Sequence, residues 1–336
     1  MKNGGASGRP LVAVVTPVYN GGAYLEAAMQ SVQQQTYDRL IHVIVDNCST
    51  DNTPEIIDRF RSQRVELITF RNGNLLPVRE NWTKALCAVP AETSYVKFLC
   101  ADDLMRSDCI SRFVAVAESD DRIGVVLCDD VFMDKVHRAN LRSDQSVFDG
   151  IEIVGKMLDG SINWLPYHHL FVRFHQDTQS AEFFKDAPVH FDFAAVARIS
   201  LCSKIAYLHD PLVWTRWHLN SLTSQELGAN RLKTLVEGFD LLCTFGLRCW
   251  DEPTFRRKKE YMRSRMMRSA IKWTLMGRWD AALELLRDLK ERRVTPSAAD
   301  WARSIIELMS YASWKRTRRL PTGPEIDEGK FRSENF

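Results

Sequence analysis

The sequence LVAVVTPVYN at residues 11–20 begins a pattern that decides the fold. Its first five residues are apolar and rich in valine, which is typical of a buried strand. Amphipathic stretches and further apolar runs then alternate as far as residue 130. Strands that alternate with helices are joined by crossover connections and form a largely parallel sheet. We therefore predict an α/β fold for this part of the chain.

The apolar runs and the helical spacings define the individual elements. We predict strands at residues 11–15, 41–45, 65–70, 95–100 and 123–128. We predict helices at residues 24–32, 53–61, 78–88 and 107–118. Beyond residue 130 the connections become longer and more aromatic, and a helical pattern returns at residues 193–203. From Glu226 onward the pattern is helical almost throughout, for example at residues 281–290 and 299–312.

The composition excludes several classes of protein. With 336 residues, 45% hydrophobic and 26% charged, the chain is neither intrinsically disordered nor a small disulfide-rich scaffold. The eight cysteines include no C-x-x-C pair, and most lie in apolar stretches, so we expect free, buried thiols in a reducing compartment. Residues 1–10 are glycine-rich without an apolar core, and no apolar run approaches 18 residues. We therefore expect neither a signal peptide nor a membrane span, and a cytoplasmic location.

Positive charge is concentrated in the C-terminal region. The net charge of the chain is +2, but residues 255–319 alone carry 18 basic and 7 acidic residues. The basic residues alternate with apolar ones, among them Phe255, Met262, Met266 and Trp273. Such amphipathic helices favour anionic bilayers, so peripheral contact with the inner membrane face is one interpretation. The alternative is a packed helical cap whose basic face is solvated.

Unusual chemistry follows three of the predicted strands. In open parallel sheets, ligands bind beyond the carboxyl ends of the strands. The first strand is followed by Tyr19, an aromatic ring that can stack on a base, and the second by a polar run at residues 46–51. The fourth is followed by the adjacent carboxylates of Asp102 and Asp103. Because paired carboxylates at a buried strand end repel each other, a divalent cation such as Mg²⁺ or Mn²⁺ is expected there. A helix-capping turn is the alternative.

Three segments together resemble one enzyme family. They are VVTPVYNGGAYLEAAMQSVQQQTY at residues 14–37, VDNCSTDNT at residues 45–53 and FLCADD at residues 98–103. This set is similar to the nucleotide-binding half of the family 2 inverting glycosyltransferases of GT-A fold. The resemblance implies a mainly parallel sheet flanked by helices, with a C-terminal helical extension. It also implies transfer of a sugar from a nucleoside diphosphate donor to an acceptor hydroxyl, with Mn²⁺ or Mg²⁺ bridging the diphosphate, in surface polysaccharide or glycoconjugate assembly.

The resemblance also implies a domain organisation. The GT-A glycosyltransferase domain is expected at residues 9–225. Its nucleotide-binding half is residues 9–130, and its acceptor half is residues 131–225. A basic helical region at residues 226–320 and a polar, disordered tail at residues 321–336 follow.

Residues of the first half take roles from the resemblance. Pro17 and Tyr19 match the loop that contacts the nucleobase, and Arg79 lies near the family's basic residue close to the nucleotide. Asp46 and Asn47 match the acidic pair after the second strand, with Asn in place of the second acid. An amide both donates and accepts hydrogen bonds, so the identity of the base stays open.

The carboxylates after the fourth strand match the metal-binding motif of the family. The resemblance places Asp102 opposite the ribose and Asp103 on the metal. The position that often holds a preceding acid is occupied by Cys100, so the motif is reduced to its last two members.

Residues of the second half complete the predicted site. Asp192, six residues before Arg198, matches the family's catalytic base, and the alternative is an N-cap for the following helix. Its neighbour Phe191 is expected to raise the pKa of Asp192 by desolvation. Arg216 and His218 match an Arg-x-His signature, which assigns Arg216 to the diphosphate and His218 to the metal. The pair at residues 168–169 receives no role beyond lining an acceptor cleft.

Other functions are less consistent with the sequence. A non-catalytic nucleotide-sugar-binding or interaction module with the same fold is the main alternative, but it would be expected to lose the base or the metal carboxylate. A dinucleotide-dependent oxidoreductase needs G-x-G-x-x-G after the first strand, and TPVYNGGAYLEAA at residues 16–28 lacks it. A nucleotidyltransferase would need a glycine-rich loop with a lysine. We expect no nucleic acid partner.

Overall fold

A computed structural model of the chain describes most of its residues. The described ranges are 8–132, 135–162, 165, 167–174, 182–187, 189–218, 221, 231–292, 298, 300–302 and 304–306. The chain divides into two compact units, one ending at Trp217 and the other beginning at His218. The predicted tail at residues 321–336 lies outside the described residues, as does part of the predicted helix at 299–312.

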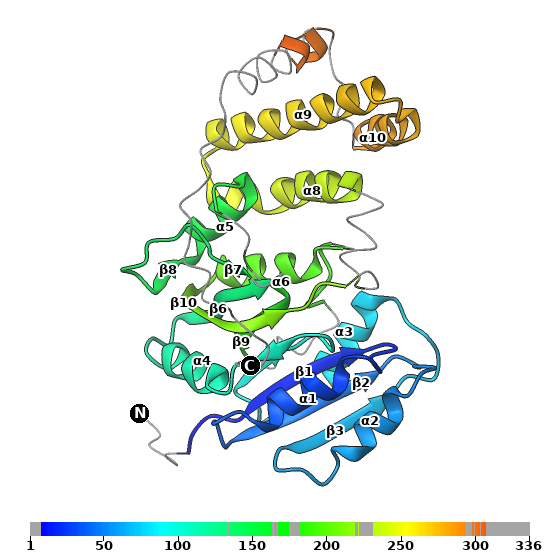
Figure 1. Cartoon of the computed structure of the whole chain (residues 1–336). Helices are drawn as coiled ribbons and strands as arrows, with labels where there is room; N and C mark the ends of the chain where they lie inside the picture. The colour runs from blue at the N-terminus through cyan, green and yellow to red at the C-terminus, as the bar shows by residue number, and fades with distance from the viewer. Residues whose placement is uncertain are drawn as a thin grey trace. The chain divides into compact units, whose positions relative to one another are not determined.

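One ten-stranded sheet forms the centre of the first unit (Figure 1). Its strand order is β3-β2-β1-β4-β9-β6-β10-β5, with β7 paired to β6 and β8 to β10. The neighbours among β1 to β4 are parallel, as are β6 and β10, whereas β9 runs antiparallel between β4 and β6. The strands are β1 (Val12–Val18), β2 (Leu40–Asp46), β3 (Glu66–Arg71), β4 (Tyr95–Phe98), β5 (Leu104–Met105), β6 (Ile123–Phe132), β7 (Lys135–His137), β8 (Val147–Asp149), β9 (Phe171–Arg173) and β10 (Lys204–Thr215).

Helices cover both faces of the sheet, because alternate side chains of each strand point to opposite faces. Along β1, Ala13 and Val15 join a core with α3, α5 and α6. Val12 and Val14 join a second core with α1 and α4. The helices of this unit are α1 (Leu25–Gln33), α2 (Thr53–Arg59), α3 (Val78–Cys87), α4 (Cys109–Ala117), α5 (Gly150–Asp159) and α6 (Phe191–Ser200), with a short 3₁₀ turn, η1 (Tyr167–His169).

The second unit is helical. It contains α8 (Arg231–Cys249), α9 (Glu252–Leu275) and α10 (Trp279–Glu291), and these three helices share one core. Phe255, Met262, Met266 and Met267 of α9 are all less than 10% exposed. The predicted membrane-facing stripe is therefore wrong for these four residues, because they pack inside the helical unit.

Two further expectations concern the chain as a whole. None of the described helices is long and apolar enough to cross a bilayer. All eight cysteines are free, but Cys87 and Cys202 are exposed, so the expectation that the thiols are buried is wrong for these two.

Candidate active site

The loops after β1 and β2 are tied together by hydrogen bonds. The backbone N–H of Asn20 donates to Ser49 Oγ at 2.9 Å, and the N–H of Thr50 donates to Asn20 Oδ1 at 2.9 Å. The Tyr19 ring, 48% exposed, lies on this braced loop and offers a stacking surface. Pro17 is buried within β1. The predicted base contacts of both residues stay predictions.

Asp46, the last residue of β2, anchors the polar loop that follows it. Its Oδ1 accepts the N–H of Ser49 at 2.9 Å, and its Oδ2 lies 3.1 Å from Nη1 of Arg71. The carboxylate is almost fully buried, while half of the Arg71 side chain is exposed. Arg71 ends the neighbouring strand β3, in register with Asp46. The sequence reasoning missed this cation, although the rule of inspecting strand ends applies to β3 as well.

The Asn47 amide makes its hydrogen bonds within the protein. Its Nδ2 donates to the carbonyl of Leu76 at 2.9 Å, and its Oδ1 accepts the N–H of Leu76 at 3.0 Å. The same oxygen accepts a bond from Asn72 Nδ2 at 2.9 Å. Asn47 thus holds the chain before α3 against the end of β2, and its predicted contact with a base stays a prediction.

The two adjacent carboxylates after β4 differ in exposure. Asp102 is half-buried in the turn, whereas Asp103 is 2% exposed. Asp103 Oδ1 accepts the backbone N–H of Arg216 at 2.8 Å, which joins the end of β4 to the end of β10. Its Oδ2 lies 3.3 Å from His169 Nε2 and 3.8 Å from His168 Nε2.

A buried polar network continues behind Asp103. Nε2 of His168 and Nε2 of His169 each lie 3.2 Å from Thr215 Oγ1. The Thr215 hydroxyl donates to Asp130 Oδ2 at 2.9 Å, so its oxygen can accept from both rings. The sequence reasoning missed Thr215 and Asp130 and gave the histidines no role. Asp129 and Asp130 are an adjacent acidic pair just after a predicted strand, as Asp102 and Asp103 are after theirs. This pattern could have indicated from the sequence that Asp130 belongs to the site.

Burial controls the protonation of this network. Burial, reinforced by the neighbouring charge of Asp102, raises the pKa of Asp103 well above its usual range. Burial also raises the pKa of Asp130 to about 6 and lowers the pKa of His168 to about 3. The pKa of His169 is lowered well below its usual value for the same reason. Two acids therefore lie beside two neutral imidazoles, a donor set that favours an added cation.

Asp192 belongs to the same region of the first unit. It is the second residue of α6, whose N-cap is His190, so the alternative reading of Asp192 as the N-cap is wrong. Burial raises the pKa of the Cys100 thiol, and the charges of Asp103, Asp102 and Asp192 raise it further, in that order. The fold thus gathers the carboxylates after β4 and the carboxylate of α6 around one thiol.

Arg216 and His218 follow β10. The Arg216 guanidinium lies over the Tyr24 ring, 4.6 Å from its centroid, and 5.4 Å from that of Trp214. These aromatic contacts hold the guanidinium, while the backbone of the same residue is bonded to the Asp103 carboxylate. His218 is the first residue of the second unit. Its predicted role as a metal ligand stays a prediction.

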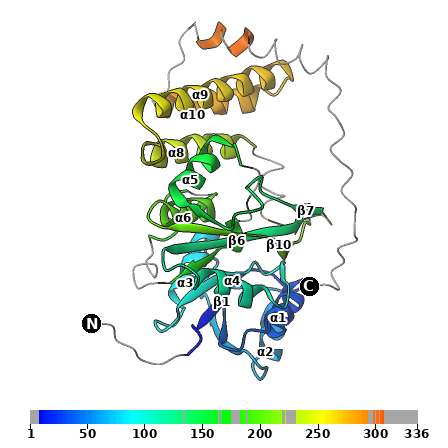
Figure 2. The same cartoon turned by 90° about the vertical axis from the view of Figure 1, so that its left-hand side faces the viewer.

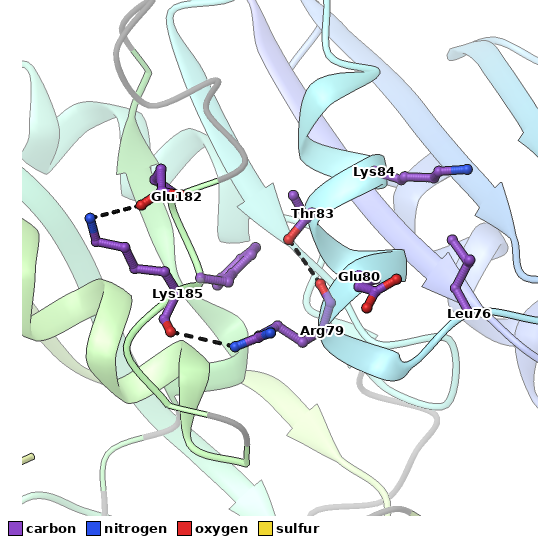
Figure 3. Close-up of a pocket in the computed structure, with 8 residues that line it drawn as sticks. Leu76, Arg79, Glu80, Thr83, Lys84, Glu182 and Lys185 are labelled. Atoms are coloured by element: carbon purple, nitrogen blue, oxygen red, sulfur yellow. Dashed lines mark hydrogen bonds and ion pairs between the residues drawn. The ribbon is translucent and has the colours of Figure 1, made fainter. Parts of the chain in front are cut away.

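Arg79 lies in a pocket between α3 and the chain before α6 (Figure 3). Its Nη1 donates to the carbonyl of Lys185 at 3.4 Å, and Lys185 forms an ion pair with Glu182 at 2.9 Å. The other lining residues are Leu76, Glu80, Thr83, Lys84 and Phe184. The predicted nucleotide contact of Arg79 stays a prediction, since its bond within the described residues is to the segment before α6.

Two sets of side chains within the described part of the chain have ligand atoms close enough to share a metal ion. One is Asp103 with His168 and His169, and the other is Asp103 with Asp102 and Cys100. In each set the ligand atoms lie within 4.8 Å of one another. Carboxylate oxygens suit both Mg²⁺ and Mn²⁺. The residues at this edge of the sheet therefore fit the predicted divalent cation.

A family model described as glycosyl transferase family 2 matches residues 13–200. This match covers more than half of the chain and includes every strand end described above except that of β10. The chain belongs to glycosyl transferase family 2. The resemblance that the sequence motifs carried is therefore confirmed.

Relatives of this family 2 chain include TuaG of Bacillus subtilis. The name of TuaG, a teichuronic acid biosynthesis glycosyltransferase, was itself assigned by inference. The two are 34% identical over 106 residues, which cover 31% of this chain and 40% of TuaG. The chain thus spans about two fifths of the length of this relative.

Solved structures show the same fold at low sequence identity. TarS residues 1–349 of S. aureus, in complex with UDP-GlcNAc, aligns with a TM-score of 0.59 at 14% identity, over 91% of this chain and 92% of TarS. The mannosyltransferase PcManGT of Pyrobaculum calidifontis, in complex with GDP-Man and Mn²⁺, aligns with a TM-score of 0.50 at 15% identity, over 93% and 82%. The predicted α/β fold of GT-A type with a C-terminal helical extension is confirmed.

Proposed function

We propose that this family 2 chain is an inverting glycosyltransferase that moves a sugar from a nucleoside diphosphate to an acceptor hydroxyl. One observation carries the proposal. The charges of Asp102, Asp103 and Asp192 all act on the Cys100 thiol, so two strand-end carboxylates and a helix carboxylate share one site. A single displacement needs a cation-binding acid and a proton-accepting acid in the same site.

The donor nucleotide would lie over the carboxyl ends of β1, β2 and β4. The exposed Tyr19 ring offers a surface for the base, and the Asp46–Arg71 pair lies at the adjoining strand ends. Asp102, the more exposed of the two acids after β4, is available to the ribose or to a metal-bound diphosphate. PcManGT contains GDP-Man and TarS contains UDP-GlcNAc, so the base is left open between the two.

We propose that Asp103 and Asp102 hold Mn²⁺ or Mg²⁺, with His218 as a further ligand. The ligand atoms of the two acids lie within 4.8 Å of each other, and Mn²⁺ is present in the PcManGT structure. When bound, the cation neutralises charge that develops on the leaving diphosphate. The hydrogen bond from the N–H of Arg216 to Oδ1 fixes the orientation of the Asp103 carboxylate.

Residues of the chain carry the remaining steps. Asp192 accepts the proton of the acceptor hydroxyl as that oxygen attacks the anomeric carbon from the face opposite the diphosphate. The Arg216 guanidinium, held by Tyr24 and Trp214, binds diphosphate oxygens and stabilises their growing charge. Inversion at the anomeric carbon follows from a single displacement.

The acceptor is proposed to be a growing surface polysaccharide or glycoconjugate. The name of TuaG refers to teichuronic acid biosynthesis, and 106 residues of this chain align with it. Assembly on the cytoplasmic face of a membrane, with contact between the helical unit and anionic lipid, completes the proposal.

A donor screen tests this function. UDP- and GDP-sugars are incubated with the chain in Mn²⁺, in Mg²⁺ and in EDTA, and released nucleoside diphosphate is measured. We expect metal-dependent hydrolysis of one donor and, with an acceptor, a product of inverted anomeric configuration by NMR. Donor binding without any release would instead support the non-catalytic module, and a retained configuration would exclude the single displacement.

A further inference from the structure

The turn between α9 and α10 exposes large apolar side chains. We define the hairpin tip as residues 275–283. Its exposed apolar residues are Leu275, Met276, Trp279 and Leu283, with exposed fractions of 76%, 62%, 62% and 59%. The two helices lie side by side in both views and contact each other (Figures 1 and 2). Apolar residues gathered at one end of a helical hairpin indicate a contact surface.

The exposed apolar residues of the hairpin tip do not belong to the core of the helical unit. The core of the helical unit takes Met266 and Ala270 from α9 and Ala281 and Leu285 from α10, and it includes none of the four exposed residues. The α10 helix thus presents one apolar face to the core and a second, beginning at Trp279, to solvent.

Hydrogen bonds hold the tip in shape. The N–H of Arg278 donates to the carbonyl of Trp273 at 2.9 Å, and the N–H of Met276 donates to that of Lys272 at 3.0 Å. Gly277 has a φ of +73°, the left-handed conformation that closes a helix C-terminus. The apolar side chains are therefore presented by a closed turn between two regular helices.

Positive charge surrounds the tip. Between Glu252 and Arg278 the chain carries nine basic and two acidic residues. Lys272 and Arg278, both exposed, flank the apolar residues, and Asp280 is the one acid between Lys272 and Leu283. A basic helix that is followed by an exposed Leu-Met pair and a Trp is suited to bind an anionic bilayer surface. Aromatic rings at such a surface lie at the level of the lipid headgroups.

We propose that the hairpin tip inserts into the interface of an anionic lipid bilayer. The contact differs from the stripe on α9 that the sequence suggested, because four residues of that stripe are less than 10% exposed, namely Phe255, Met262, Met266 and Met267. Charge complementarity favours lipid over a second copy of the chain, since two copies would bring two strongly basic α9 helices together. The inference is independent of sugar transfer.

Vesicle flotation with the full chain tests the proposal. The vesicles are phosphatidylcholine alone or phosphatidylcholine with about 30% phosphatidylglycerol, which gives the surface a negative potential that attracts basic segments. The tip variant carries Leu275→Ser and Trp279→Ser. The matched control carries Leu247→Ser and Tyr261→Ser, which are 55% and 61% exposed on α8 and α9. We expect at least tenfold stronger binding to the anionic vesicles, a loss of about tenfold in the tip variant and little change in the control.

A fluorescence measurement tests insertion in a variant that is expected to keep the fold. Trp279→Phe keeps an apolar ring, and lipids brominated in the upper acyl chain quench an inserted Trp. The quenching by anionic vesicles should fall in Trp279→Phe relative to the wild-type chain. The proposal is overturned if the tip variant and the control bind vesicles alike, if the quenching is unchanged, or if the tip variant only converts a dimer to a monomer in light scattering.

Discussion

The carboxylate of Asp103 accepts a hydrogen bond from the backbone N–H of Arg216 at 2.8 Å. The two residues are 113 positions apart, and the bond joins the turn after β4 to the end of β10. Asp103 therefore has a structural role in addition to the proposed metal role, whereas Asp102 lies beside it with greater exposure. Substitution of Asp103 should therefore affect both stability and metal binding, whereas substitution of Asp102 should affect mainly metal binding.

Asp103→Ala is expected to lower both stability and metal-dependent nucleotide binding. Removal of the carboxylate leaves the buried N–H of Arg216 without its acceptor, which costs on the order of 1–3 kcal/mol. Asp102→Ala, at a more exposed position, should weaken Mn²⁺-dependent binding of UDP or GDP with little change in stability. Denaturant unfolding and calorimetric titration of nucleotide with Mn²⁺ measure the two effects.

Asp103→Asn serves as the control for this pair. Its amide oxygen can still accept the N–H of Arg216, and the amide carries no buried charge. At pH 7 its stability should therefore match or exceed that of wild type, while metal binding stays weak. Full nucleotide affinity in both Asp102→Ala and Asp103→Asn would contradict the proposed metal site.

Asp192→Asn is expected to reduce sugar transfer by about 10²–10⁴-fold, the usual contribution of a general base. Nucleotide and Mn²⁺ affinities should stay within a factor of about two, because the proposed donor site does not include Asp192. Glu152→Gln is the matched control, an exposed acid on α5 that pairs with Lys156 at 2.5 Å. Transfer rates and donor affinities are compared for the three proteins. Equal rates of sugar transfer in Asp192→Asn and wild type would show that Asp192 is not the catalytic base.

The sequence predicted the first half of the fold because local patterns determine it. The alternation of apolar runs and helical spacings located the elements from β1 to β6 to within a few residues, except for the two-residue strand β5, which was missed. The strand-end rule led to Tyr19, Asp46 and Asp102. The second half has short antiparallel strands, such as β9, whose pairing with β4 and β6 depends on contacts distant in sequence. No local period indicates such strands.

Parts of the site were missed for the same reason. The bonds of Thr215 to Asp130 and to His169 join residues 85 and 46 positions apart, and no spacing rule connects them. The sequence left open whether the apolar stripe on α9 faces a membrane or neighbouring helices, because an apolar face has the same period in both cases. Only the packing of α8 and α10 against α9 distinguishes the two.

His42 is expected to make the chain less stable as the pH falls from 7 to 5. Burial in β2 lowers its pKa to about 3, below the unfolded value of 6.5. The unfolded chain therefore binds a proton that the folded chain does not, and stability present above pH 6.5 is lost on acidification. This residue alone should contribute about 2 kcal/mol of loss over that interval.

His42→Gln isolates this contribution. Glutamine can retain a hydrogen bond to the Thr16 hydroxyl, which lies 2.9 Å from His42 Nε2, and it does not titrate. The free energy of unfolding is measured in denaturant at pH 5 and pH 7 for both proteins. A wild-type difference between the two pH values that persists unchanged in His42→Gln would contradict the prediction.

Asp130 is expected to make the chain less stable as the pH rises, which is the opposite of the effect of His42. Burial raises its pKa to about 6, so the folded chain holds a proton that the unfolded chain releases near pH 4. This contribution to stability is present below pH 4 and is lost as the pH rises from about 4 to 6. Asp130→Asn, whose amide oxygen can still accept the Thr215 hydroxyl, should therefore be more stable than wild type at pH 7, by on the order of 1–3 kcal/mol.

The same substitution should weaken the cation site. The charge of Asp130 acts on Asp103, and a buried negative charge near a metal ligand increases the affinity for a divalent ion. Melting temperatures at pH 7, with and without Mn²⁺, give both results in one experiment. We expect Asp130→Asn to melt higher than wild type without metal and to gain less from Mn²⁺. If Mn²⁺ raises the melting temperature of both proteins equally, Asp130 lies outside the electrostatic reach of the bound ion, and the buried network behind Asp103 serves the fold alone.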